Sequence, residues 1–263
     1  MKYEDLSIIL IIVSLFIGTQ IFGLYIASNY FTEEVPFGLE PPEIEETESP
    51  WYLFVVVLIM TGVLLVLLKL KWSKLIKVWF LFAFIICASV TLNVFVGGVI
   101  ALIIAITLFV IKYIEKDLIM HNLTEMLVYV GLPVLITPIF DLTSIIILLL
   151  LISAYDFVSV FLTKHMITLA KAQQKMGLFA GLLVKKGKEA AVLGGGDIVF
   201  PLMFASILLR DFNIYYALSA ILLSSIGLLT IIFLGQKKKF YPAMPFITGG
   251  CFLTLILLYF KIF

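Results

Sequence analysis

Residues 190–209 read AAVLGGGDIVFPLMFASILL, an apolar run interrupted by three glycines and one acid, Asp197. A carboxylate at the centre of a membrane helix costs on the order of 2.5–3.5 kcal/mol, so an acid kept there indicates a functional site. The other acid well inside an apolar segment is Asp156. The chain is therefore organised around two acids on successive apolar segments.

The composition is that of a polytopic membrane protein. Of the 263 residues, 63% are hydrophobic and 13% are charged, and the mean hydropathy is +1.19. Soluble domains contain about 25% charged residues. The net charge of +1 gives no reason to expect nucleic acid as a partner. Cys87 and Cys251 lie in apolar runs without metal-ligand neighbours, so neither a disulfide nor a metal site is expected.

Apolar segments predict an all-α fold with nine transmembrane helices in one membrane-embedded domain, residues 1–263. The expected helices are about 6–28, 51–70, 78–96, 98–111, 123–140, 142–162, 189–209, 214–234 and 243–260. Residues 78–111 carry no charge and as one helix would be about 51 Å long. Since the hydrocarbon core is about 30 Å thick, Gly97-Gly98 favours a turn between two helices.

The distribution of lysine and arginine supports nine helices. With the N-terminus in the cytoplasm, 16 of the 18 basic residues fall on the cytoplasmic side, including six lysines in the connection from Thr163 to Lys188. Only Arg210 and Lys261 then lie outside. Treating residues 78–111 as one span would reverse every later loop. The positive-inside rule therefore predicts a cytoplasmic N-terminus and an extracellular C-terminus.

The two acids are expected at similar depth. Asp156 lies seven residues before Thr163, about 10 Å from the cytoplasmic end of its helix, and Asp197 lies nine residues after Lys188, about 13–14 Å in. Two close carboxyl groups share a proton and titrate as a pair. One can then act as general base on water while the other donates to a peptide carbonyl. This aspartic-protease chemistry needs no metal or cofactor, and none is expected.

Three short motifs carry a family resemblance. Tyr155-Asp156 on the sixth expected helix, Gly194-Gly195-Gly196-Asp197 on the seventh and Pro242-Ala243-Met244 before the ninth resemble the Tyr-Asp, Gly-x-Gly-Asp and Pro-Ala-Leu motifs of the presenilin and signal peptide peptidase family. The departure, methionine for leucine at 244, conserves volume. Without long loops, the chain looks like an archaeal or other microbial homologue.

The resemblance implies that Asp156 and Asp197 are catalytic. It also implies that Pro242-Ala243-Met244 supports the active site and substrate entry. On this reading the protein is a multi-pass protease of the cell membrane with transmembrane-helix proteins and membrane lipids as partners, and a homo-oligomer is compatible with it. Gly194–Gly196 would let an extended substrate approach, although small residues more often serve helix packing.

Other functions remain open from the sequence. The same two acids could serve a proton-coupled transporter or cation leak channel, and a prepilin-type peptidase also resembles a Gly-x-Gly-Asp protease. Against a transporter stands the lack of an internal repeat.

The remaining polar residues are assigned simpler roles. His121 and His165 are expected to be solvated at the interface, and Glu125 and Asp141 to lie at helix boundaries. The segment from Gly177 to Lys186 is expected either to pair as an edge strand with an unwound substrate or to form an interfacial helix or frayed loop.

Overall fold

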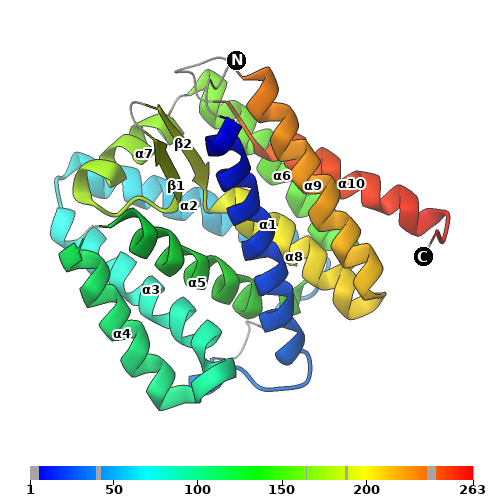
Figure 1. The fold of residues 1–263 in the computed structure, drawn as a ribbon, viewed down its shortest axis with the longest axis horizontal. Helices are drawn as coiled ribbons and strands as arrows, with labels where there is room; N and C mark the ends of the chain where they lie inside the picture. Colours follow the sequence, from blue (N-terminus) through cyan, green and yellow to red (C-terminus); the bar gives the residue numbers. More distant parts are fainter. Residues whose placement is uncertain are drawn as a thin grey trace.

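The computed structural model describes residues 6–39, 43–115, 117–163, 165–186, 189–235 and 241–262. Most of these residues form a bundle of apolar helices, with one β-hairpin inserted before α8 (Figure 1). The α-helices are α1 Leu6–Asn29, α2 Ser49–Lys69, α3 Ser73–Val96, α4 Gly98–Glu115, α5 Leu118–Ile136, α6 Leu142–Phe157, α7 His165–Met176, α8 Gly196–Asp211, α9 Ile214–Leu234 and α10 Met244–Tyr259. Short helical turns are Pro36–Gly38, Thr137–Ile139 and the π-helical Val158–Leu162.

In the described part of the chain, seven helices are long and apolar enough to cross a membrane. They are α1 to α5, the segment Leu142–Leu162 and α9. The other two expected spans correspond to α8 and α10, which have 16 residues each and are about 24 Å long. The all-helical membrane class is therefore confirmed, whereas length and composition identify seven spans rather than nine.

Helix ends follow from local sequence. Gly97, at φ +81°, separates α3 from α4, at the turn that Gly97-Gly98 predicts. Asp141 is the N-cap of α6 and forms a capping box with Ser144, consistent with a boundary residue. Asp117 caps α5 by accepting hydrogen bonds from Ile119 and Met120.

Helix α8 lies at the centre of the bundle, and α2 and α4 lie at its surface. Ile198, Leu202, Phe204 and Ile207 of α8 are fully buried against α1, α5, α6, α9 and α10. By contrast, only about a tenth of the residues in the apolar stretches of α2 and α4 are buried within the protein. Helices that are apolar all round can expose such faces when lipid is the solvent. The part of α8 that follows Asp197 is thus buried along most of its length.

The expected helix 189–209 is wrong at its start, because Glu189–Gly194 forms strand β2. It pairs antiparallel with β1, Gly181–Lys186, in a register that runs from Gly181 opposite Gly194 to Lys186 opposite Glu189. Three consecutive glycines disfavour helix, and α8 begins only at Gly196. In Figure 1 the hairpin lies beside one end of α1.

Helices α9 and α10 are in backbone contact through two glycines. A Cβ on Gly227 would overlap the Phe246 carbonyl, and one on Gly250 would overlap the Leu223 carbonyl. Small residues commonly allow such close helix packing in membranes. Since α10 begins at Met244, this contact fixes the helix that follows the Pro242-Ala243-Met244 motif.

We expect Gly250→Ala to lower the melting temperature of the detergent-solubilised protein by several degrees, because the added methyl must force two backbones apart. Gly249→Ala is the matched control, since a Cβ there meets nothing within 4 Å. Thermal unfolding of both variants measures the difference. Equal melting temperatures would show that the two helices are not closely packed in solution.

Candidate active site

Asp156 lies near the end of α6 and contacts the beginning of α10. Its Oδ2 accepts a hydrogen bond from the Met244 backbone N–H at 3.1 Å. Because the first N–H groups of a helix have no partner within the helix, a carboxylate there satisfies one of them and interacts favourably with the helix dipole. Ser153 adds a second link by donating to Thr248 Oγ1 at 2.8 Å. The Tyr-Asp motif is thus joined to Met244 although 88 residues separate Asp156 and Met244.

Asp197 lies in the first turn of α8, not about nine residues inside a helix as expected. The Gly194 N–H donates to Asp197 Oδ2 at 3.2 Å, so the last residue of β2 orients the carboxyl group. Asp197 is therefore placed by a strand-to-helix turn, and its depth cannot be counted from Lys188 along a helix. Asp197 thus lies at the N-terminus of its own helix, as the carboxyl group of Asp156 lies at the N-terminus of α10, and negative charge is favoured at both places.

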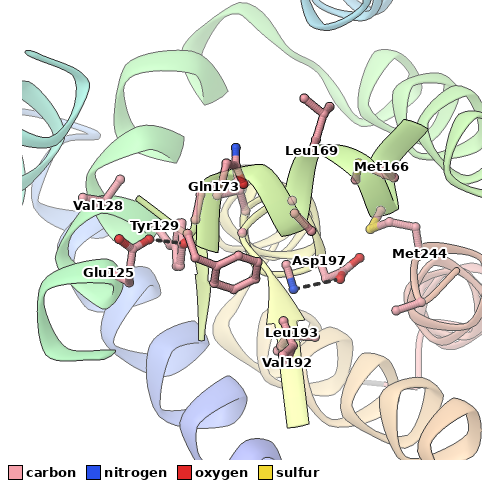
Figure 2. Close-up of a pocket in the computed structure, with 18 of the residues that line it drawn as sticks. Glu125, Val128, Tyr129, Met166, Leu169, Gln173, Val192, Leu193, Asp197 and Met244 are labelled. Atoms are coloured by element: carbon pink, nitrogen blue, oxygen red, sulfur yellow. Dashed lines mark hydrogen bonds between the residues drawn. The ribbon is translucent and has the colours of Figure 1, made fainter. Parts of the chain in front are cut away.

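The two acids line one cavity of about 840 Å³. Both aspartates therefore border the same internal space. Figure 2 shows Asp197 between Tyr129 on one side and Met244 on the other. The expected site residues that line this cavity are Tyr155, Asp156, Gly194, Gly195, Gly196, Asp197, Ala243 and Met244. Pro242 instead lines a neighbouring apolar cavity of about 430 Å³.

Tyr155 joins α6 to two other elements. Its ring packs edge-on against Phe54 of α2, with centroids 6.3 Å apart, and its hydroxyl is 2.8 Å from His165 Nε2. The second ring nitrogen of His165 is 2.5 Å from Thr163 Oγ1. Burial lowers the pKa of His165, which favours the neutral ring. His165 is partly exposed, in keeping with a residue at the interface, but it also connects α7 to the Tyr-Asp motif.

The sequence did not indicate a second polar cluster in the same cavity. Glu125 of α5 is 7% exposed and binds Lys112 of α4, with Nζ 2.5 Å from Oε1. Its other oxygen accepts a hydrogen bond from Tyr129, which Figure 2 shows as a dashed line. All three residues line the cavity. Glu125 is therefore not a boundary residue at the headgroups. The available signal was the spacing of Glu125 and Tyr129, which places them on one helix face.

His121 also differs from expectation. Its Nε2 is 2.9 Å from the Gly181 carbonyl oxygen, so it contacts β1 and is not an isolated solvated residue. Among the residues that the structure describes, no group of three or more His, Cys, Asp and Glu could hold a metal ion.

Two carboxyl groups that face one cavity inside a bundle of apolar helices form the arrangement of a membrane-embedded aspartyl protease. Comparison with known families agrees with this class. The model of the family described as "Signal-peptide peptidase, presenilin aspartyl protease" matches residues 13–261. The chain belongs to this family and is an intramembrane aspartyl protease, a multi-pass integral membrane protein. The transporter, channel and prepilin-peptidase alternatives are set aside by this match.

Solved structures show the same fold. The chain is similar to two structures of a presenilin family intramembrane aspartate protease, one in space group C222 and one in space group P2. For the first, the TM-score is 0.64 at 20% identity, covering 93% of this chain and 94% of the other. For the second, the TM-score is 0.67 at 21% identity, covering 92% and 95%. Comparison with curated proteins gives no significant match.

Proposed function

We propose that Asp156 and Asp197 are the catalytic pair of an endopeptidase that cleaves peptide bonds within transmembrane helices of other proteins. The observation that carries this proposal is the cavity that both aspartates line. One carboxylate takes a proton from water as the water attacks the scissile carbonyl. The other, protonated, donates to the carbonyl oxygen.

The proposed topology has nine spans, with α8 and α10 added to the seven long helices. Their length of about 24 Å is short for a hydrocarbon core of about 30 Å. However, the N-termini of both helices border the cavity, through Gly196 and Met244, so neither helix needs to cross the full core alone. The lysine distribution supports a cytoplasmic N-terminus and an extracellular C-terminus. We propose that the exposed apolar faces of α2 and α4 contact membrane lipid.

A transmembrane substrate must be unwound before water can attack, because its amides are bonded within the helix. The expected edge strand forms at β1, but α5 side chains occupy its outer edge. Asn122 donates to the Leu183 carbonyl at 2.7 Å and accepts from the Leu183 N–H at 2.9 Å. His121 contacts the Gly181 carbonyl on the same edge. We therefore do not place the substrate along β1.

Among the described residues, the outer edge of β2 is the more exposed one at Val192. In an antiparallel pair, the N–H and C=O of one residue point to the same side, and residues outside the hydrogen-bonded pairs point away from the partner strand. Leu183 lies opposite Val192. Because the polar groups of Leu183 point to Asn122, those of Val192 point away from β1. Val192 lines the cavity and is 42% exposed. We therefore place the unwound substrate along β2, next to Asp197.

The pH dependence of cleavage is expected to be bell-shaped. A pair that shares one proton is active when one carboxyl is protonated and the other ionised. The rate should fall at high pH as the last proton leaves, and at low pH as both carboxyl groups become neutral. Initial rates on a single-span peptide in detergent measure the profile, with melting temperatures taken at each pH as a control for folding. A flat profile over the pH range of the folded protein would contradict a shared proton.

A further inference from the structure

The backbone of Gly195 is covered by the ring of Tyr129. A Cβ on Gly195 would lie 2.6 Å from Tyr129 Cε1, 3.0 Å from Cζ and 3.2 Å from the hydroxyl oxygen. Neighbouring glycines have more room, since the nearest atom to a Cβ is at 3.2 Å for Gly194 and 3.5 Å for Gly196. The ring therefore occupies the space in which a side chain at position 195 would stand, two residues before Asp197.

Tyr129 is itself held by a buried glutamate and the partly buried lysine that pairs with it. Its hydroxyl donates to Glu125, and Glu125 is ion-paired with Lys112. The Lys112 ammonium also lies 5.3 Å from the centre of the Phe84 ring. Tyr129 is only 4% exposed. Breaking a buried charged pair leaves an unpartnered group at high cost, so the ring has little freedom to move. A continuous set of contacts thus runs from α4 through α5 to the turn that carries Asp197.

We propose that Tyr129 is a positioning residue for the reaction. Its ring supports the Gly194–Gly196 turn so that the carboxyl group of Asp197 faces Asp156, and the Glu125–Lys112 pair fixes the ring. This inference rests on the proposed catalytic role of Asp197. An ion pair with a purely structural role would contribute to folding but would leave the geometry of the two carboxyl groups, and hence kcat, unchanged.

A double-mutant cycle between positions 129 and 195 tests the contact. Gly195→Ala forces the ring away and is expected to lower kcat about tenfold, because small misplacements of reacting groups are costly. Tyr129→Leu removes the three ring atoms that face Gly195 and is expected to cause a similar loss. Since leucine leaves space for the added methyl, the double variant should be no slower than Tyr129→Leu alone. A fully additive loss of about a hundredfold would overturn the proposal.

A second pair of variants tests the polar contacts. Tyr129→Phe keeps the ring and removes its hydrogen bond, and Glu125→Gln keeps the shape of the side chain. We expect kcat to fall about fivefold in each, the loss of about one hydrogen bond, with KM within about twofold because substrate contacts are retained. Both limbs of the pH profile should stay in place while its maximum falls. Unchanged kcat in both variants would overturn the proposal, as would a displaced limb, which would make Glu125 a titrating participant.

Folding is followed in the same preparations by melting temperature and gel filtration. Gly18→Ala is the matched control for adding a methyl group to this protein, since a Cβ there meets nothing within 4 Å. If Tyr129→Leu does not fold, the positioning role of Tyr129 is tested by Gly195→Ala and Tyr129→Phe alone, and the proposal then requires that both lower kcat. Failure of the catalytic pair is distinguishable, because it would appear as activity in Asp197→Asn whatever the outcome at position 129.

Discussion

Replacing Asp197 by asparagine is expected to abolish peptide-bond cleavage while leaving the helix bundle folded. Asparagine has nearly the same shape, and its amide oxygen can still accept the Gly194 N–H. It cannot exchange a proton with water or with the substrate carbonyl. The same reasoning applies to Asp156→Asn, whose amide oxygen can still accept the Met244 N–H. Turnover should fall by about 10,000-fold or more in either variant.

Mass spectrometry of a single-span peptide incubated with each purified variant measures this loss. Asp117→Asn is the matched control. Asp117 is the N-cap of α5, and asparagine caps a helix about as well as aspartate. This variant should therefore cleave normally. Near-normal turnover by Asp156→Asn or Asp197→Asn, with intact melting temperature, would contradict the assignment of the pair.

The second large effect is expected on the outer edge of β2. Val192→Pro removes the N–H that points away from β1, and proline is tolerated on a strand edge where the ladder does not need that donor. We expect kcat/KM to fall about 10- to 100-fold, because an unwound substrate carbonyl would lose its partner. Val192→Ala keeps the N–H and should lose much less.

Proline at two positions in β1 provides a contrast. The Leu182–Leu193 pair lies in the hydrogen-bonded part of the ladder, and the Leu183 N–H donates to Asn122. Leu182→Pro and Leu183→Pro should therefore lower the melting temperature as well as turnover. Val192→Pro should lower turnover with little change in melting temperature. Normal cleavage by Val192→Pro would show that substrate does not pair with β2.

The sequence predicts the long helices well because hydropathy directly reports transfer into lipid. The bounds of α9 coincide with the expected 214–234, and those of α1 differ by one residue. The hairpin could not be predicted in the same way. A short apolar run such as Ala190–Leu193 is compatible with helix or strand, and the choice depends on pairing with a distant segment. As a result, the depth expected for Asp197 rested on a helix start that was seven residues too early.

The site could be predicted only for residues that are anomalous by themselves. An acid in an apolar run stands out, so Asp156 and Asp197 are visible in the sequence. Tyr129 is not, because a tyrosine on an apolar helix is ordinary. Its position over Gly195 depends on how α5 packs against the turn before α8. Likewise, the sequence alone suggests that Glu125 is an acid at a helix end. Its ion pair with Lys112 becomes visible only when the fold places the two helices side by side.

The backbone contact between α9 and α10 has a mechanical consequence. Two helices in backbone contact at Gly227 and Gly250 cannot easily slide or separate, so α9 and α10 form one rigid unit. At one end of this unit, the Met244 N–H donates a hydrogen bond to Asp156. Both helices of the unit also pack against α8, which carries Asp197. A displacement of α9 and α10 together would therefore move the surroundings of both carboxyl groups.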